Sequence, residues 1–157
     1  MSGFYLNELL LRLLHRHDPH PALFHSYDIA LRKIALRDDL ALQQALRIFE
    51  KELLQEIGYG LILDHDVVTD QPVAAEGMYR YHMEKGPERI ALANIVNTLG
   101  MVLHGHTLLG LAHNELHDVI NLHEAKQLLR KMLAVHLGQQ PLRSREFYGE
   151  MLVGVSA

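Results

Sequence analysis

The sequence contains no cysteine among its 157 residues. This absence excludes disulfides, thiolate zinc sites and cysteine nucleophiles together, and it fits a reducing cytoplasm. The chain also has no apolar run close to the length of about 20 residues that a transmembrane helix needs. Its leucine-rich amino end is interrupted by Glu8 and Arg12 and follows no basic stretch, so it does not match a signal peptide.

Positive charge is scarce as well. The formal net charge is −4, so the whole chain lacks the excess of lysine and arginine that is typical of nucleic-acid-binding proteins. Any contact with DNA would therefore need a local basic patch. A content of 22% charged and 48% hydrophobic residues, at this length, predicts one globular domain with a single core. Twelve histidines are the one unusual count.

Helical periodicity is the strongest positive signal, and it is clearest in residues 42–57. Apolar side chains recur there at helical spacing and form one stripe that must be buried. Arg47, Lys51 and Leu54 lie on the other side at i, i+4 and i+7, where we expect them to be exposed. Gly58 supplies the left-handed residue that ends the helix. The stripe consists of Leu42, Ala45, Leu46, Phe49, Leu53 and Ile57.

The rest of the pattern predicts a mainly α fold: a compact bundle of five to six helices with a small, irregular β/loop insertion after the third helix. Within that insertion, at about 61–103, residues 78–81 favour a strand, and 90–103 give conflicting helix and strand signals. We expect one helical domain over 4–152, with residues 1–3 as a leader. The other expected helices are 4–15, 22–36, 107–116, 122–137 and 144–152.

Several polar residues are placed to cap these helices. Asp39 precedes the helix at 42–57, and Asn121 with Glu124 forms a capping pair for the helix at 122–137. Gly138 closes that helix, and Ser144 caps the last one.

The histidines raise one chemical alternative. His104 and His106 flank a glycine, His113 and His117 are four residues apart on an expected helix, and His123 follows. Such a group could hold zinc and would suit a metal-binding or hydrolytic domain. The order is His-x-Glu-x-His, however, which is not the metalloprotease pattern His-Glu-x-x-His. We therefore favour solvated histidines and expect no metal, no cofactor and no catalysis.

Two cationic groups are candidate binding surfaces. Lys126, Arg130, Arg143 and Arg145 could hold a few DNA phosphates, with Lys131 on a neighbouring face. No aromatic residue lies among them for base stacking, and an ordinary solvated helix face explains them equally well.

The second group is Arg47, Lys51 and Leu54. It would suit an acidic peptide that ends in an apolar residue with a free carboxylate, because arginine grips carboxylates bidentately and leucine offers an apolar contact. From the residues alone, a solvated face is the better interpretation.

Three stretches in order carry a family resemblance: YLNELLLRLL at 5–14, ALRIFEKELLQEIGYGL at 45–61 and AKQLLRKMLAVHLGQQPLRSREFY at 125–148, with YRYHMEKG between the last two. Together they resemble the carboxy-terminal part of the bacterial RecO family. The resemblance implies a cytoplasmic, nucleoid-associated mediator of recombinational repair. Such proteins bind and anneal DNA, engage RecR, help to load RecA, and dock on the acidic tail of the single-stranded-DNA-binding protein. It favours a partner site at Arg47, Lys51 and Leu54.

The sequence departs from that family in two respects. The amino-terminal OB-fold domain of the family is absent here, so we expect weak binding of single-stranded DNA. Some members hold zinc in a four-cysteine site after the turn that is written GYGL here, whereas this loop has Asp66 and Thr69. In this respect the chain resembles the zinc-free members.

Overall fold

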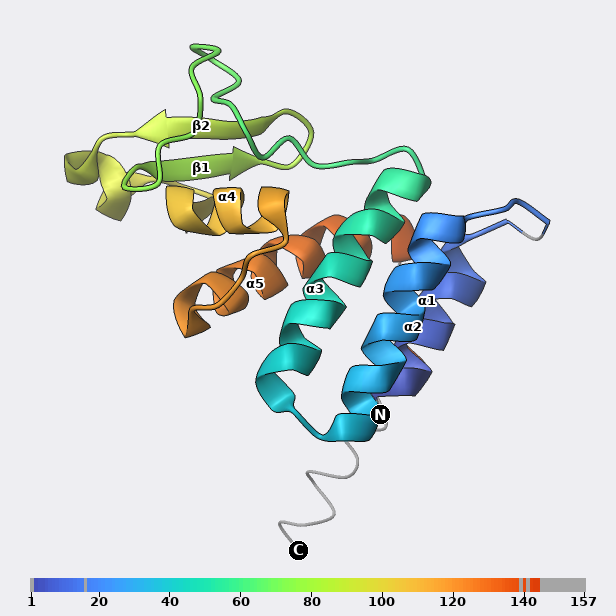
Figure 1. Ribbon diagram of the computed structural model, residues 1–157. Coiled ribbons are helices and arrows are strands. Elements are labelled where there is room, and N and C mark those ends of the chain that lie inside the picture. Colours follow the sequence, from blue (N-terminus) through green and yellow to red (C-terminus); the bar gives the residue numbers. More distant parts are fainter. Residues whose placement is uncertain (1, 16, 139, 141, 145–157) are drawn as a thin grey trace, which may run out of the picture.

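The computed structural model describes residues 2–15, 17–138, 140 and 142–144. It is mainly helical, as the periodicity predicted, and it also contains a small antiparallel sheet (Figure 1). The predicted helix at 144–152 lies almost wholly outside the described residues. In chain order the elements are α1 (Ser2–Leu13), α2 (Pro21–Leu36), α3 (Asp39–Glu56), β1 (Met78–His82), β2 (Gly86–Ile90), the 3₁₀ helix η1 (Leu92–Asn97), β3 (Met101–His104), α4 (Gly105–His113) and α5 (Val119–Leu137).

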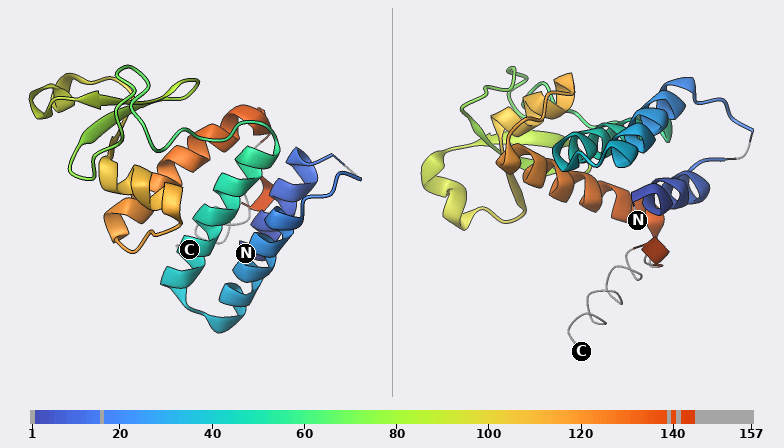
Figure 2. Two further views of the ribbon diagram at one scale, coloured as in Figure 1. Left: turned by 45° about the horizontal axis from the view of Figure 1, so that its top comes forward. Right: turned by 60° about the horizontal axis from the view of Figure 1, so that its bottom comes forward.

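The helices form two groups, α1 to α3 and α4 with α5, and α3 contacts both. Helices α1, α2 and α3 lie side by side at one end of the molecule, and the sheet lies at the other end (Figures 1 and 2). Helix α5 crosses behind α3, and α4 lies between α5 and the sheet. Helix α3 therefore has neighbours on several sides, which decides how much of its surface reaches solvent.

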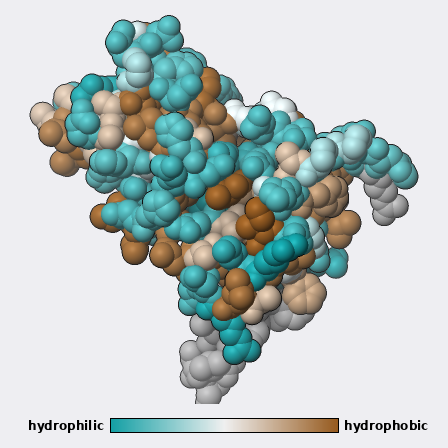
Figure 3. Space-filling view, viewed as in Figure 1, coloured by the Kyte–Doolittle hydropathy of each residue, from teal (hydrophilic) through white to brown (hydrophobic). Residues whose placement is uncertain are grey.

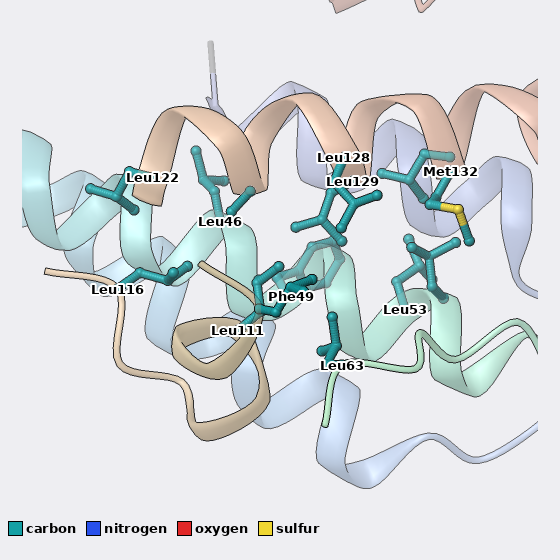
Figure 4. Close-up of a cluster of buried hydrophobic side chains, with 14 of the residues drawn as sticks. Leu46, Phe49, Leu53, Leu63, Leu111, Leu116, Leu122, Leu128, Leu129 and Met132 are labelled. Atoms are coloured by element: carbon teal, nitrogen blue, oxygen red, sulfur yellow. The ribbon is translucent and has the colours of Figure 1, made fainter. Parts of the chain in front are cut away.

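The core is built mainly from leucines of α3, α4 and α5 (Figure 4). The predicted stripe of α3 is confirmed: Phe49 and Leu53 are fully buried, and Leu42 and Ile57 at its ends are partly buried. Burying one such side chain stabilises the fold by about 1.5–3 kcal/mol. The labelled side chains of the cluster are Leu46, Phe49, Leu53, Leu63, Leu111, Leu116, Leu122, Leu128, Leu129 and Met132.

Two predicted amino-terminal caps are wrong by a few residues. Asp38, not Asp39, caps α3, because its carboxylate accepts the Ala41 N–H at 3.0 Å. Asp118 caps α5 by accepting the Ile120 N–H at 2.6 Å, so this helix begins before the predicted Asn121. In both cases an aspartate just before the helix competes successfully with a later polar residue. Positive φ angles at Gly58 and Gly138 confirm those two helix ends.

The insertion contains an ordered sheet rather than an irregular loop. Strand β1 is central in the order β2–β1–β3, and the predicted strand at 78–81 is confirmed. Tyr79 pairs with Arg89 on one side and with Leu103 on the other. The ambiguous residues 90–103 divide into η1 and β3, which explains why neither period dominated there.

One glycine fixes the insertion to the helices. The first backbone N–H groups of α4 are taken by the loop before β1: Gly105 donates to the Gly77 carbonyl at 2.7 Å, and His106 donates to Ala75 at 3.0 Å. A Cβ atom at Gly105 would lie 1.8 Å from the Ala74 carbonyl oxygen. Only glycine allows this approach.

Among the described residues, no helix is both long and apolar enough to span a membrane.

Candidate interaction surfaces

Arg47 is buried, and the prediction that it is exposed is wrong. Only 3% of the residue is accessible. Its guanidinium faces Glu50, with Nη2 donating to Oε1 at 3.0 Å and Nε lying 2.8 Å from Oε2. Tyr5 of α1 donates its hydroxyl to the same Oε1 at 2.5 Å. The pair therefore lies inside the molecule, between α3 and α1.

The error has a physical reason. A single apolar stripe suggested one buried face, but α3 packs against α2, α4 and α5, so its buried surface is much wider. Leu54, which was also expected outside, is fully buried. The one signal in the sequence was the i, i+3 spacing of Arg47 and Glu50, which permits an ion pair on a helix.

Lys51, one turn beyond Arg47, holds two helices together. Its Nζ donates to the Leu111 carbonyl at 2.6 Å and to the side-chain oxygen of Asn114. These acceptors lie at the carboxy-terminal end of α4, where a cation is favourable. Burial lowers the pKa of Lys51. The partly buried lysine is thus a helix cap as the structure stands, rather than a free surface charge.

The pair of Arg47 and Glu50 leaves three buried polar atoms without a hydrogen bond in the described part of the chain: Nε and Nη1 of Arg47 and Oε2 of Glu50. A buried unpaired donor costs free energy, about 1–3 kcal/mol. The ion pair is therefore an incomplete site.

The predicted DNA-binding residues divide between two places. Lys126 and Arg130 are exposed on α5, together with Lys131 on an adjacent part of the same outer surface. Arg143 is also exposed, and its backbone N–H donates to Glu8 of α1 at 2.7 Å. Arg145 lies outside the described residues. We call Lys126, Arg130 and Lys131 the basic face of α5.

The histidines do not form the group that the sequence suggested. Helix α4 ends at His113, and Asn114 adopts a left-handed φ of 59°, so His113 and His117 do not share a helix. His104 contacts Glu124 at 2.6 Å, and His123 contacts Gln127 at 3.1 Å. Among the described residues, no three histidine, aspartate or glutamate side chains are placed to hold one metal ion.

Asp66 has a structural role that the sequence did not reveal. Its buried carboxylate accepts backbone N–H groups from Val68 at 2.8 Å, Thr69 at 3.2 Å and Arg89 at 3.0 Å. Burial alone would raise the pKa of Asp66, but these donors outweigh it, and the pKa is lowered. One carboxylate thus ties the loop after α3 to strand β2.

The tip of the insertion is apolar and exposed. Leu92, Val96 and Leu99 are 74%, 93% and 87% accessible, and the tip over η1 is brown-tinted at the left of Figure 3. A separate cavity of about 530 Å³ lies beside β1 and β2. Its lining includes charged residues of both signs, Lys85 with Asp70 and Glu88.

Comparison with known proteins places this chain in a family. The family model described as "Recombination protein O C terminal" matches residues 1–146. The chain is 47% identical over 151 residues to the DNA repair protein RecO of Nitrosococcus oceani, covering 96% of this chain and 59% of that protein. It is 46% identical to RecO of Alkalilimnicola ehrlichii, with coverages of 96% and 58%, and 44% identical to RecO of Pseudomonas putida, with coverages of 94% and 61%.

These shares mean that the chain spans about three fifths of the length of these relatives. The matched part is the carboxy-terminal part of the RecO proteins. Because the family model covers all of the described residues and the relatives exceed 40% identity, the chain belongs to the RecO carboxy-terminal family.

Proposed function

We propose that this chain is a non-catalytic mediator domain in bacterial DNA repair and recombination. The observation that carries the proposal is the family match over residues 1–146, together with relatives named as DNA repair proteins. In this proposal the domain works in the cytoplasm at the nucleoid. It supports strand annealing and RecA loading through contacts with DNA, with RecR and with the tail of the single-stranded-DNA-binding protein.

The basic face of α5 is our candidate for the DNA contact, with Arg143 and Arg145 as further phosphate ligands. Lys126 and Arg130 are one helical turn apart and exposed, which suits neighbouring phosphates. Such contacts are independent of base sequence and weaken steeply with salt, because bound cations are released from the DNA. The net charge of −4 opposes them, so the affinity of this chain alone should be low.

A titration of labelled single-stranded DNA, followed by fluorescence anisotropy at low and high salt, tests this contact. We expect Arg130→Ala to weaken binding and to reduce the salt dependence by about one counterion. Arg32→Ala is the matched control, because Arg32 is an exposed helical arginine that belongs to α2. Equal losses in both variants would argue against a specific face, and tight binding at high salt would indicate a stacking surface instead.

The acidic tail of the single-stranded-DNA-binding protein is the proposed ligand of the Arg47, Lys51 and Leu54 segment of α3. The chemistry still suits it, since arginine binds a terminal carboxylate bidentately and lysine attracts acidic side chains. The burial of these residues adds a requirement, because the tail can reach them only if side chains around α3 move. With one peptide and few contacts, we expect a dissociation constant of about 1 μM, or about −8 kcal/mol.

Fluorescence polarisation with a labelled tail peptide tests this second contact. A peptide with an amidated end is the control, since it keeps the sequence but removes the terminal carboxylate. We expect the amidated peptide to bind clearly more weakly, because hydrogen bonds to a charged group are worth about 1.5–3 kcal/mol. Equal binding of the two peptides would remove the terminal carboxylate from the proposal.

A further inference from the structure

We propose that Glu50 is an internal competitor for the carboxylate site of Arg47, so that an acidic peptide binds by displacing the Glu50 side chain. This inference rests on the proposed docking of a carboxylate-ended peptide on α3. It adds the mechanism by which the site is kept closed. It also explains how an arginine that is 3% accessible could take part in recognition.

The Glu50 carboxylate lies directly against the guanidinium of Arg47. Two nitrogen atoms of Arg47, Nε and Nη2, face the two carboxylate oxygens of Glu50 at 2.8 Å and 3.0 Å. Only the contact of Nη2 with Oε1 is a hydrogen bond, whereas Nε and Oε2 lie close together without one. Arginine also holds the carboxylate of a bound peptide or substrate by placing its guanidinium against it. Both side chains are 4% accessible. Glu50 therefore occupies the position that a ligand carboxylate would take.

The burial of Arg47 means that only another carboxylate can replace Glu50 without leaving an unpaired charge. Removing Glu50 without replacement would leave Arg47 as an unpaired buried charge, which is costly. If a ligand carboxylate takes the place of Glu50, Arg47 keeps a negatively charged partner. In addition, Nη1 is buried without a partner among the described residues, and an incoming carboxylate could satisfy it. Arg47 is thus paired with Glu50, and yet its hydrogen-bonding capacity is not fully used.

Tyr5 stabilises the Glu50 side chain in its contact with Arg47. Its hydroxyl donates to Oε1 of Glu50 from α1, which is 45 residues away in the sequence. This hydrogen bond stabilises Glu50 in the position that blocks Arg47. Weakening it should favour the open form without removing either charge of the pair.

The opposite interpretation is that Glu50 only orients Arg47 while a ligand binds elsewhere on the guanidinium. The two interpretations predict opposite signs. If Glu50 competes, Glu50→Gln strengthens peptide binding, because the neutral amide is a poorer partner for Arg47. If Glu50 orients, the same substitution weakens binding.

The experiment titrates a labelled, carboxylate-ended tail peptide into the full chain and into three variants, with folding checked by circular dichroism. We expect Glu50→Gln to bind about tenfold more tightly, which corresponds to about 1.4 kcal/mol. Glu56→Gln is the matched control, because it removes one carboxylate from an exposed residue of the same helix. It should change affinity less than twofold. The amidated peptide should lose the gain that Glu50→Gln produces.

The third variant protects the test against misfolding. Tyr5→Phe removes one hydrogen bond to Glu50 and keeps the ion pair, so it should bind the peptide two- to threefold more tightly. If Glu50→Gln does not fold, the Tyr5→Phe result decides. Unchanged or weaker binding in the deciding variant would overturn the inference.

The outcomes also separate this inference from the proposed function. Peptide binding by the unmodified chain with no gain in the variants would leave tail docking intact and reject the competitor. Binding by Glu50→Gln alone would support the competitor and show that the closed pair blocks docking. Binding by none of the proteins would reject both.

Discussion

Arg47 and Glu50 form an ion pair in a buried environment, and this determines the effect of changing either residue. Arg47→Glu would place a second carboxylate against Glu50 where less than a twentieth of each side chain reaches solvent. We expect a loss of about 3–5 kcal/mol in the free energy of unfolding, because an uncompensated charge remains buried. Urea denaturation followed by circular dichroism measures this.

The control for that prediction is Arg32→Glu, an identical chemical change in an exposed pair. Arg32 and Asp28 are 76% and 55% accessible, so solvent screens their interaction. This variant should lose less than about 1 kcal/mol. If Arg47→Glu were equally mild, the buried pair described here would be wrong.

Asp66 should make stability depend on pH. Its folded pKa lies below the usual value of 3.8, since the backbone donors from Val68, Thr69 and Arg89 favour the charged form against the effect of burial. Its contribution is therefore complete above that usual value and is lost as the pH falls through the folded pKa. Asp66→Asn should cost about 1–3 kcal/mol at pH 7, and its difference from the unmodified chain should shrink at pH 3.

Urea unfolding at both pH values checks this, with Asp64→Asn as the neighbouring control. The Asp64 side chain is 79% accessible and contacts His65, so its removal should matter much less. A constant difference between Asp66→Asn and the unmodified chain across this pH range would contradict the assignment.

At the scale of elements, the connection between the β1 loop and α4 depends on Gly105. A methyl group there would meet the Ala74 carbonyl oxygen at 1.8 Å, so either the loop or the helix must move. We expect Gly105→Ala to destabilise the fold by about 1–3 kcal/mol. Gly3→Ala is the control, because nothing lies within 4 Å of the added carbon. Thermal unfolding of both variants would show a clear drop only for Gly105→Ala.

The elements also show what the sequence could and could not predict. Phe49 and Leu53 follow local periodicity, and their burial was predictable because one helix face is enough to specify it. The burial of Arg47 was not, since it depends on how many helices surround α3. Asn121 looked like a cap but accepts a hydrogen bond from Thr107 instead, a contact between two elements that no local pattern contains. Long-range partners therefore limited the site prediction more than the fold prediction.

At the scale of the whole molecule, α1 joins segments that are distant in the sequence. Arg12 donates to the Leu137 carbonyl at 2.8 Å, at the end of α5, and Glu8 accepts the N–H groups of Arg143 and Ser144. Because each contact spans more than 120 residues, α1 supports the region that carries Arg143. These hydrogen bonds join the two ends of the described chain, which the periodicity predicted only as separate helices.

The continuous core of the molecule leads us to expect that folding needs no metal. Fully buried leucines of α3, α4 and α5 form one continuous core with the sheet residues Tyr79 and Leu103. Asp66 already ties the loop after α3 to β2 through hydrogen bonds from backbone N–H groups. We therefore expect an unchanged melting temperature when the purified chain is heated with a chelator. A structural metal contributes folding energy directly, so a large drop in melting temperature would contradict this expectation. Adding zinc back would then identify the ion, and substituting His104 of β3 or His65 of the loop after α3 would show which segment holds it.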